Sequence, residues 1–268
     1  MVRIVTLTSD FGLEDEYVGV MKGVILSRAP AAAIVDLCHG IAAHDLTQAA
    51  FMLNGAWRYF PAGTIHVVVV DPGVGSERRV VLLEAGGQFF LAPDNGLLTL
   101  VRAGNDVGRA WKVDRASLFL KRVGMTFHGR DIFAPVAGSL ASGLAPEQVG
   151  PRLEVDELIG LPGLEPRLDR DVGQLIGMVV RVDRFGNLLS NIGIGLLREV
   201  FGDVSPDRLR IGCGTRVIDG LSETYSNLPI GVPLALIGSR DTLELAVNQG
   251  RAAVSFKAGV GSEIRVFK

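Results

Sequence analysis

Two kinds of hydrophobic pattern alternate over the first half of the chain. Short apolar runs bounded by turn residues predict buried strands, and apolar positions every three to four residues predict helices. The predicted strands cover residues 3–8, 33–37, 65–70, 80–83 and 88–92. The predicted helices cover residues 14–27, 46–57 after an N-cap at Asp45, a short segment after Asp94-Asn95-Gly96, and 131–141. This alternation is typical of an α/β domain with a mostly parallel sheet flanked by helices.

The pattern changes after residue 160. Residues 160–171 contain two prolines and two glycines without apolar periodicity, which favours a linker. We therefore expect an N-terminal α/β domain over 1–162, a linker over 163–171 and a second domain over 172–268. The second domain has closely spaced β-like runs separated by turn residues, which predict a small antiparallel β-barrel. These runs are 175–182, 187–192, 209–211, 215–218, 233–237, 242–247, 252–256 and 263–267.

Charge and composition narrow the function classes. The chain has 27 basic and 29 acidic residues and no long run of like charges, which argues against a nucleic-acid partner. No apolar stretch approaches the roughly 20 residues that span a bilayer, so we expect no membrane association. Cys38 and Cys213 lack CxxC or Cys/His metal spacing. They indicate reduced thiols and a cytoplasmic location.

Asp10 stands in the segment Thr8-Ser9-Asp10-Phe11-Gly12, where the first predicted strand gives way to a helix. One interpretation is an aspartate of a turn or a helix start. The other is a carboxylate that binds ribose hydroxyls, as acidic residues do in nucleotide-binding sheets. Neither a GxGxxG fingerprint nor a Walker loop follows, so a nucleoside-type ligand without phosphates is favoured.

Asp71 directly follows the valine run 67–70, and a glycine-containing turn separates it from Arg78. A charge at the end of a buried strand needs a partner or solvent, because burying it unpaired costs several kcal/mol. A structural ion pair explains Asp71 and Arg78 by themselves. His128, in Phe127-His128-Gly129, adds a group that titrates near neutral pH. Because an Asp/Arg/His cluster is able to polarise one water molecule, these three residues are the candidate catalytic residues.

Other polar segments have structural interpretations. Asp94-Asn95-Gly96 is typical of a turn and a helix start. The segment Asp183-Arg184-Phe185-Gly186-Asn187 resembles a tight hairpin turn, and Gly238-Ser239-Arg240-Asp241 a turn between strands. His39 and His44 have no third ligand at metal spacing, so we expect no metal site.

Taken together, these segments resemble the S-adenosyl-L-methionine (SAM) hydroxide adenosyltransferases, which are SAM hydrolases related to the bacterial fluorinase and chlorinase. The resemblance implies an N-terminal α/β domain, a C-terminal β-barrel, and SAM as the substrate without a cofactor. It also implies a homotrimer that binds SAM between the N-domain of one subunit and the C-domain of its neighbour. The resemblance spans nearly the whole chain and is carried by Thr8-Ser9-Asp10, the run Ala92-Pro93-Asp94-Asn95-Gly96-Leu97-Leu98, Phe127-His128-Gly129-Arg130-Asp131, the hairpin segment from Asp183 to Asn187, and Ser239-Arg240.

The resemblance assigns roles residue by residue. Asp71, Arg78 and His128 match the water-activating triad of the hydrolases, and Asp10 matches the carboxylate that holds the ribose hydroxyls.

The other matches lie in the predicted barrel domain. Asp183 matches the acidic group that receives the methionine ammonium, and Asn187 matches the amide that reads adenine. Ser239 and Arg240 match positions near the methionine carboxylate and the adenosyl group. Phe185 and Tyr225 match the aromatic side chains that pack against the adenine base.

Departures from the halogenase pattern favour water as the nucleophile. Fluorinase-like enzymes have tyrosines at the positions of Asp71 and His128 and a serine at the position of Gly129. They also carry an insertion after the match to Arg78-Arg79, where this chain has only a short predicted hairpin. Chlorinase also has glycine at the Gly129 position, so Asp71 and His128 carry the distinction. The expected function is hydrolysis of SAM, and the alternatives are SAM-dependent chloride transfer and a SAM or adenosine sensor without turnover.

Overall fold

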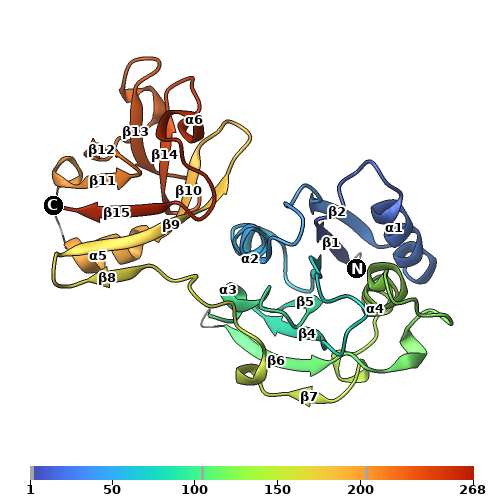
Figure 1. Ribbon diagram of the computed structural model, residues 1–268. Coiled ribbons are helices and arrows are strands. Elements are labelled where there is room, and N and C mark those ends of the chain that lie inside the picture. Colours follow the sequence, from blue (N-terminus) through green and yellow to red (C-terminus); the bar gives the residue numbers. More distant parts are fainter. Residues whose placement is uncertain (1–2, 104–105, 203–204) are drawn as a thin grey trace. The chain divides into compact units, whose positions relative to one another are not determined.

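The computed structural model describes residues 3–103, 106–202 and 205–268. It divides into two compact units, Met1–Pro162 and Gly163–Lys268 (Figure 1). The first unit contains a mixed seven-stranded sheet with helices, and the second contains an eight-stranded antiparallel sheet. The predicted fold class, an α/β domain followed by a small antiparallel barrel, is confirmed. The stretch 163–171 that the sequence predicts as a linker includes β8 (Arg167–Asp169), which pairs with β9 (Gln174–Val182).

The strands of the first sheet are β1 (Ile4–Ser9), β2 (Ala33–Cys38), β3 (Ile65–Val69), β4 (Val80–Ala85), β5 (Gln88–Pro93), β6 (Val107–Lys112) and β7 (Arg152–Leu153). Their order across the sheet is β2-β1-β3-β5-β4-β6-β7. The first four strands in this order pair in parallel, and the remaining pairs are antiparallel. Parallel strands are covered by helices on both faces, which accounts for the nearly continuous apolar run of β3.

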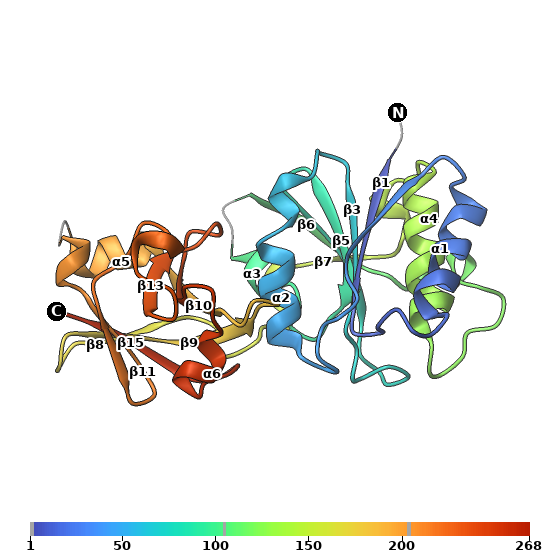
Figure 2. The ribbon, with the colours of Figure 1, turned by 90° about the horizontal axis from the view of Figure 1, so that it is seen from above.

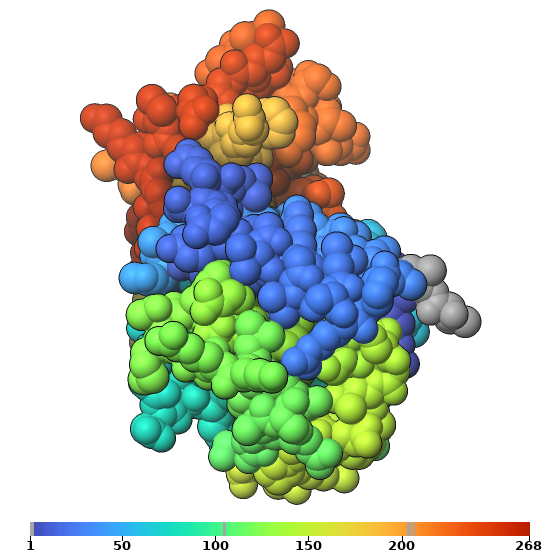
Figure 3. All heavy atoms as spheres, turned by 90° about the vertical axis from the view of Figure 1, so that its right-hand side faces the viewer, coloured from blue at the N-terminus to red at the C-terminus, as the bar shows by residue number. Residues whose placement is uncertain are grey.

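Helices cover both faces of this sheet. On one face lie α1 (Tyr17–Arg28) and α4 (Ala134–Ala141), and on the other lie α2 (Leu46–Asn54) and α3 (Thr99–Arg102) (Figure 2). The space-filling view shows that early (blue) and middle (green) parts of the chain lie side by side on one side of this unit (Figure 3). No helix within the described ranges is long and apolar enough to cross a membrane.

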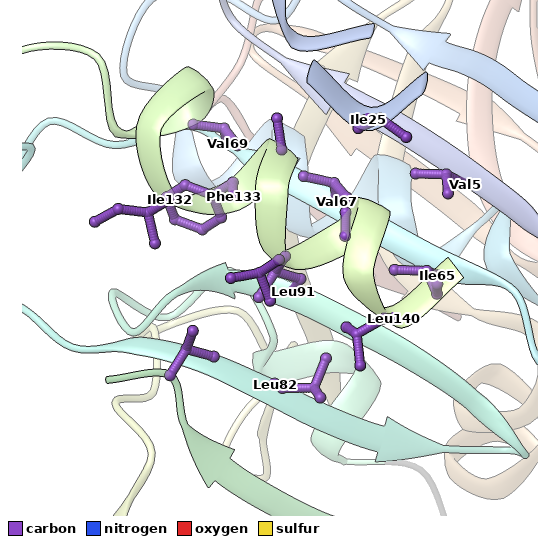
Figure 4. Close-up of a cluster of buried hydrophobic side chains, with 14 of the residues drawn as sticks. Val5, Ile25, Ile65, Val67, Val69, Leu82, Leu91, Ile132, Phe133 and Leu140 are labelled. Carbon is purple, nitrogen blue, oxygen red and sulfur yellow. The ribbon is translucent and has the colours of Figure 1, made fainter. Parts of the chain in front are cut away.

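The core of the first unit has two halves, one on each face of the sheet. Successive side chains of a strand point to opposite faces. Accordingly, Val67 and Val69 pack in the cluster beneath α1 and α4, whereas Val68 and Val70 pack in the cluster beneath α2. In Figure 4, Phe133, from the segment before α4, points into the first cluster together with Val67 and Val69. This packing fixes the residues that precede Asp71 and those that follow His128.

The elements of the first unit differ from the prediction at several points. The first helix begins at Tyr17, three residues after the predicted start, and the acidic residues before it lie outside the helix. The predicted helix 131–141 is a π-helical turn over Gly129–Phe133 that continues into α4. Strands β6 and β7 were not predicted, because β6 mixes Gly108, Arg109 and Lys112 with its apolar residues and β7 has only two residues.

The second unit is a nearly closed barrel. Its sheet order is β12-β11-β15-β9-β10-β14-β13, with β8 beside β9. Ser222, shortly after β12, forms an isolated bridge with Leu236 of β13, so the two ends of the sheet approach each other. The remaining strands are β10 (Leu188–Gly193), β11 (Arg210–Cys213), β12 (Arg216–Asp219), β13 (Pro233–Ile237), β14 (Thr242–Val247) and β15 (Glu263–Phe267).

Two helices of the second unit were not predicted. The predicted strand 252–256 is wrong, because these residues form α6 (Ala252–Phe256). Its buried residues, Ala252 and Phe256, are four positions apart and pack against the barrel core. A short apolar run does not distinguish a strand from a buried helical turn. The second helix, α5 (Ile194–Phe201), buries Leu197 and Phe201 in the same way.

Candidate active site

Asp10 and Asp71 follow neighbouring parallel strands. Ser9 at the end of β1 is in register with Val69 at the end of β3. The carboxyl ends of parallel strands meet at one edge of a sheet, where ligands of α/β proteins bind. Asp10, Asp71 and His128 all line a cavity of about 330 Å³ at this edge, within the first unit. The structure thus brings together the residues of this unit that the sequence singled out.

Arg78 connects Asp71 with His128. Its Nε donates to Asp71 Oδ1 at 2.9 Å and to Oδ2 at 2.8 Å, and its Nη2 also donates to Oδ2. The same Nη2 lies 2.8 Å from His128 Nδ1. The Arg78 and Asp71 side chains are only 10% and 5% exposed. The ion pair that the sequence allowed therefore exists, and it includes the histidine.

The hydrogen bond from Arg78 defines the state of the His128 ring. A guanidinium only donates, so Nδ1 must be the acceptor, and the neutral ring carries its proton on Nε2. Burial lowers the pKa of His128, and the positive charge of Arg78 lowers it further, while Asp71 opposes the shift. The ring is therefore neutral at physiological pH. Protonating it would place a second cation beside Arg78.

A hydrogen-bonded chain supports the loop that carries Asp10. Ser9 Oγ accepts from the backbone N–H of Phe11 at 3.3 Å and lies 2.7 Å from His39 Nδ1. His39 Nε2 lies 3.1 Å from Asp36 Oδ1, and Lys22 pairs with the other oxygen of Asp36. The sequence does not predict this network, since its members are close only once β1 and β2 pair. Its effect is to hold the turn after β1 in place.

Asp10 and three aromatic rings complete the cavity. Asp10 Oδ2 accepts a hydrogen bond from the backbone N–H of His44 at 3.0 Å. Phe127 lies 5.9 Å from Phe11 and 4.9 Å from Tyr17, measured between ring centroids, with edge-to-face geometry in both pairs. The cavity therefore combines an apolar wall with two carboxylates, Asp10 and Asp71, and two histidines, His44 and His128. Such a mixture suits a ligand with an aromatic or sugar part and a reacting polar centre.

The remaining predicted residues line a second cavity, of about 860 Å³, within the barrel unit. They come from the turn between β9 and β10, the turn between β13 and β14, and the segment before β13. The predicted residues in its wall are Asp183, Phe185, Asn187, Tyr225, Ser239 and Arg240.

The turn between β9 and β10 is held by Asp183. Its Oδ1 accepts from the Asn187 backbone N–H at 2.8 Å, and its Oδ2 accepts from Asn187 Nδ2 at 3.1 Å. Gly186 has φ +86°, and a Cβ at this position would lie 2.8 Å from the Cβ of Arg251, so only glycine suits this site. Phe185 at the tip of the turn is 74% exposed. The predicted hairpin turn is confirmed, and it leaves an exposed aromatic ring at the cavity.

Tyr225 has a partner that the sequence does not predict. Its hydroxyl donates to Glu244 Oε1 at 2.7 Å. Burial raises the pKa of Tyr225, and the carboxylate of Glu244 raises it further. Glu244 is buried on β14 and also lines the cavity. The alternation of polar and apolar residues along 242–247 was a signal for it, because Thr242 and Glu244 fall on the face opposite Leu243 and Leu245.

The turn at Asp94 is structural. Arg79 Nε donates to Asp94 Oδ2 at 2.7 Å, and the Ile159 backbone N–H donates to Oδ1 at 2.8 Å. Asn95 Nδ2 donates to the carbonyl of Val70, the residue before Asp71, at 2.9 Å. This turn therefore stabilises the chain directly after β3, just before Asp71. Within the described part of the chain, no group of three or more His, Cys, Asp or Glu side chains is placed to hold a metal ion.

Both units match known protein-family models. Residues 5–150 match the SAM hydroxide adenosyltransferase N-terminal domain, and residues 177–265 match the SAM hydroxide adenosyltransferase C-terminal domain. The matched segments include every predicted site residue and leave out the region of the unit boundary.

Individual relatives agree with this match over nearly their full length. An (R)-S-adenosyl-L-methionine hydrolase of Thermus thermophilus is 41% identical, with 97% of this chain and 98% of the relative covered. A fluorinase of Nocardia brasiliensis is 30% identical, with 98% and 97% covered. The crystal structure of an uncharacterized conserved protein from Thermotoga maritima superposes with a TM-score of 0.90 at 35% identity, covering 99% of this chain and 100% of that chain.

Proposed function

This chain belongs to the SAM hydroxide adenosyltransferase family, and from this premise we propose that it hydrolyses SAM to adenosine and L-methionine. The observation that carries the proposal is the buried Asp71–Arg78–His128 cluster at the sheet edge. By the resemblance described above, fluorinase-like enzymes have tyrosines in place of Asp71 and His128. Charged and titratable groups at these positions suit activation of water better than capture of a halide.

The reaction is an in-line displacement at C5′ of the ribose. The water oxygen forms a bond to C5′ as the bond from C5′ to the sulfonium breaks. The electrons of that bond neutralise the sulfur, so methionine leaves as a neutral thioether, and water gives up one proton. Placing water opposite the sulfur contributes a large part of the rate, since effective molarities of about 10⁵ to 10⁸ M are known for well-oriented reactants.

The geometry supports Asp71 as the acceptor of the water proton. In the neutral tautomer of His128, Nδ1 accepts from Arg78 and Nε2 already carries a proton, so the ring has no free lone pair. Asp71 accepts from Arg78 and keeps further lone pairs on both oxygens. Arg78 stabilises the negative charge that develops as the proton leaves, and His128 holds Arg78 in place. General-base assistance of this kind is worth about 10² to 10⁴ in rate.

The resemblance assigns the substrate contacts to residues of the two cavities. In the first unit, Asp10 binds the ribose hydroxyls. In the barrel unit, Asp183 receives the methionine ammonium, and Ser239 and Arg240 bind near the methionine carboxylate and the adenosyl group. Adenine is read by Asn187 and contacted by Phe185 and Tyr225.

We further propose that the functional unit is a homotrimer in which the N-terminal unit of one subunit and the barrel of its neighbour share one SAM. A mixture of Asp71→Ala and Asp183→Ala subunits then regains activity, because some interfaces combine two intact halves. Co-purified mixed oligomers are compared with each variant alone in a SAM turnover assay. An active monomer in sedimentation, or no recovery in verified mixed oligomers, contradicts shared sites.

The two free cysteines, Cys38 and Cys213, support a cytoplasmic location, which we also propose.

Product analysis tests the function itself. Purified protein is incubated with SAM in buffer that contains chloride, and the products are separated by chromatography with mass detection. The proposal predicts adenosine and L-methionine in equal amounts. Formation of 5′-chloro-5′-deoxyadenosine identifies a chlorinase, and unchanged SAM with measurable binding identifies a sensor; either result overturns the proposal.

Asp183→Ala lowers the affinity for SAM more than the turnover of bound SAM. Its proposed partner, the methionine ammonium, is remote from C5′, and a hydrogen bond to a charged group is worth about 1.5–3 kcal/mol, or roughly ten- to a hundredfold in Kd. Steady-state kinetics measure this as a rise in KM with a smaller change in kcat. Asp219→Ala, at an exposed position of β12, is the matched control. An unchanged KM in the folded variant removes Asp183 from the binding site.

A further inference from the structure

The wall of the barrel cavity contains a carboxylate that the proposed function does not use. Glu244 is 7% exposed and lines this cavity. Its Oε1 accepts a hydrogen bond from the hydroxyl of Tyr225. Glutamate is rarely buried to this degree unless it is paired, because removing its charge from water is costly. The same wall carries four arginines, Arg181, Arg184, Arg240 and Arg251, and one other carboxylate, Asp183, so it suits a ligand that bears both an ammonium and a carboxylate group.

The barrel directs Glu244 towards this cavity. Its neighbours along β14, Leu243 and Leu245, are fully buried in the barrel core, so Glu244 points to the outer face. On this face it is in register with Leu189 of β10, another residue that lines the cavity. A Cβ on Gly238 would lie 2.5 Å from Glu244 Oε2. The absence of a side chain at Gly238 thus makes room for the carboxylate beside the Ser239-Arg240 turn.

Three groups from three different segments act on the charge of Glu244. Asp183 comes from the turn between β9 and β10, Arg240 from the turn between β13 and β14, and Tyr225 from the segment before β13. Burial raises the pKa of Glu244, and the negative charge of Asp183 raises it further. The Tyr225 hydrogen bond and the positive charge of Arg240 lower it. When two carboxylates are close enough to repel each other across one cavity, a cation that binds between them relieves the repulsion.

We propose that Glu244 is a second carboxylate of the subsite for the α-ammonium group of SAM, acting together with Asp183, and that Tyr225 is a positioning residue that orients Glu244. This inference rests on the proposed function and adds a residue that determines specificity. It assigns the Tyr225 hydroxyl to the amino-acid end of the substrate, while the ring of Tyr225 keeps its proposed contact with adenine. Ligands that carry the α-ammonium group of an amino-acid part are thereby distinguished from adenosine and 5′-methylthioadenosine, which have no such group.

Calorimetric titration of Glu244→Gln tests the proposal without turnover. S-adenosyl-L-homocysteine carries the ammonium and the carboxylate but no reactive sulfonium, its decarboxylated form keeps only the ammonium, and 5′-methylthioadenosine has neither. Glu244→Gln weakens binding of the first two by about tenfold or more, the size expected for losing a charged partner. Binding of 5′-methylthioadenosine stays within about twofold. Glu199→Gln, on the exposed side of α5, leaves all three affinities unchanged.

The pH dependence provides a second readout. Glu244 attracts an ammonium only when ionised, so affinity for the two ammonium ligands falls as the pH drops through its raised pKa. Glu244→Gln removes this dependence. Tyr225→Phe moves its midpoint to higher pH, because the hydrogen bond that lowers the pKa of Glu244 is lost. This variant keeps the ring and supplies the test if Glu244→Gln does not fold.

Thermal unfolding distinguishes the proposed role from a purely structural one, in which Glu244→Gln lowers the Tm and leaves the affinity for both ammonium ligands unchanged. An acid whose folded pKa is raised stabilises the fold only below that pKa, and the contribution is lost as the pH rises through it. At pH 7.5 Glu244→Gln therefore leaves the Tm unchanged or higher while ligand affinity falls. Equal affinity of wild type and Glu244→Gln for both ammonium ligands overturns the inference alone. Wild-type protein that binds neither S-adenosyl-L-homocysteine nor SAM overturns the proposed function, and the inference with it.

Discussion

Asp71→Asn lowers the turnover of SAM by about 100-fold or more and leaves the affinity for SAM within a few-fold of wild type. Asparagine is nearly isosteric with aspartate, so it opens no cavity, but it is neutral and does not take a proton from water. The loss corresponds to general-base assistance, which is worth about 10² to 10⁴ in rate. Single-turnover kinetics separate this loss from changes in substrate binding.

Asp156→Asn is the control for Asp71→Asn, because Asp156 is an exposed aspartate of the same unit.

His128→Ala also slows turnover by about 100-fold, since Arg78 loses the partner that holds it in place. If the three residues act as one unit, the Asp71→Asn/His128→Ala double variant is scarcely slower than the worse single variant. Wild-type turnover in both folded single variants means that this cluster is structural and that water is activated elsewhere.

Arg78→Met destabilises the protein by about 3–5 kcal/mol and abolishes most of the turnover. Methionine retains bulk but leaves the buried Asp71 carboxylate without its cation, and breaking a buried pair in this way is strongly destabilising. Urea unfolding measures the loss of stability, and the SAM assay measures the loss of turnover.

The Asp71→Asn/Arg78→Met double variant is the control for the charge argument. It removes both partners, so part of the stability returns while the turnover does not. Arg78→Lys, which keeps the charge without the planar fork, destabilises less and still lowers turnover. Wild-type stability in Arg78→Met means that the ion pair makes no net contribution to the fold.

The sequence predicts most of the framework around the cavity of Asp10 and Asp71, because two of its strands are easily recognised. The apolar runs of β1 and β3 are long enough to identify as buried strands, and the polar residues that follow them must emerge at one edge of a parallel sheet. Asp10 and Asp71 therefore became candidates from pattern alone. That Arg78 donates to both Asp71 and His128 did not follow, because His128 is 50 positions away in the chain.

Residues that act through tertiary contacts were missed. Ser9, His39 and Asp36 become a hydrogen-bonded network only when β1 and β2 pair. Glu244 lies in an alternating strand pattern, in which a polar residue on the outer face ordinarily contacts solvent. Only the folded barrel, with Tyr225 placed over this face, shows that Glu244 is buried.

Incorporation of ¹⁸O from labelled water tests the central claim most directly. The protein is incubated with SAM in H₂¹⁸O, and adenosine and methionine are analysed by mass spectrometry with fragmentation to locate the label. Attack of water on C5′ predicts one ¹⁸O atom at the 5′-oxygen of adenosine and none in methionine. Unlabelled adenosine, or 5′-methylthioadenosine together with labelled homoserine, contradicts hydrolysis at C5′ by the Asp71–Arg78–His128 cluster.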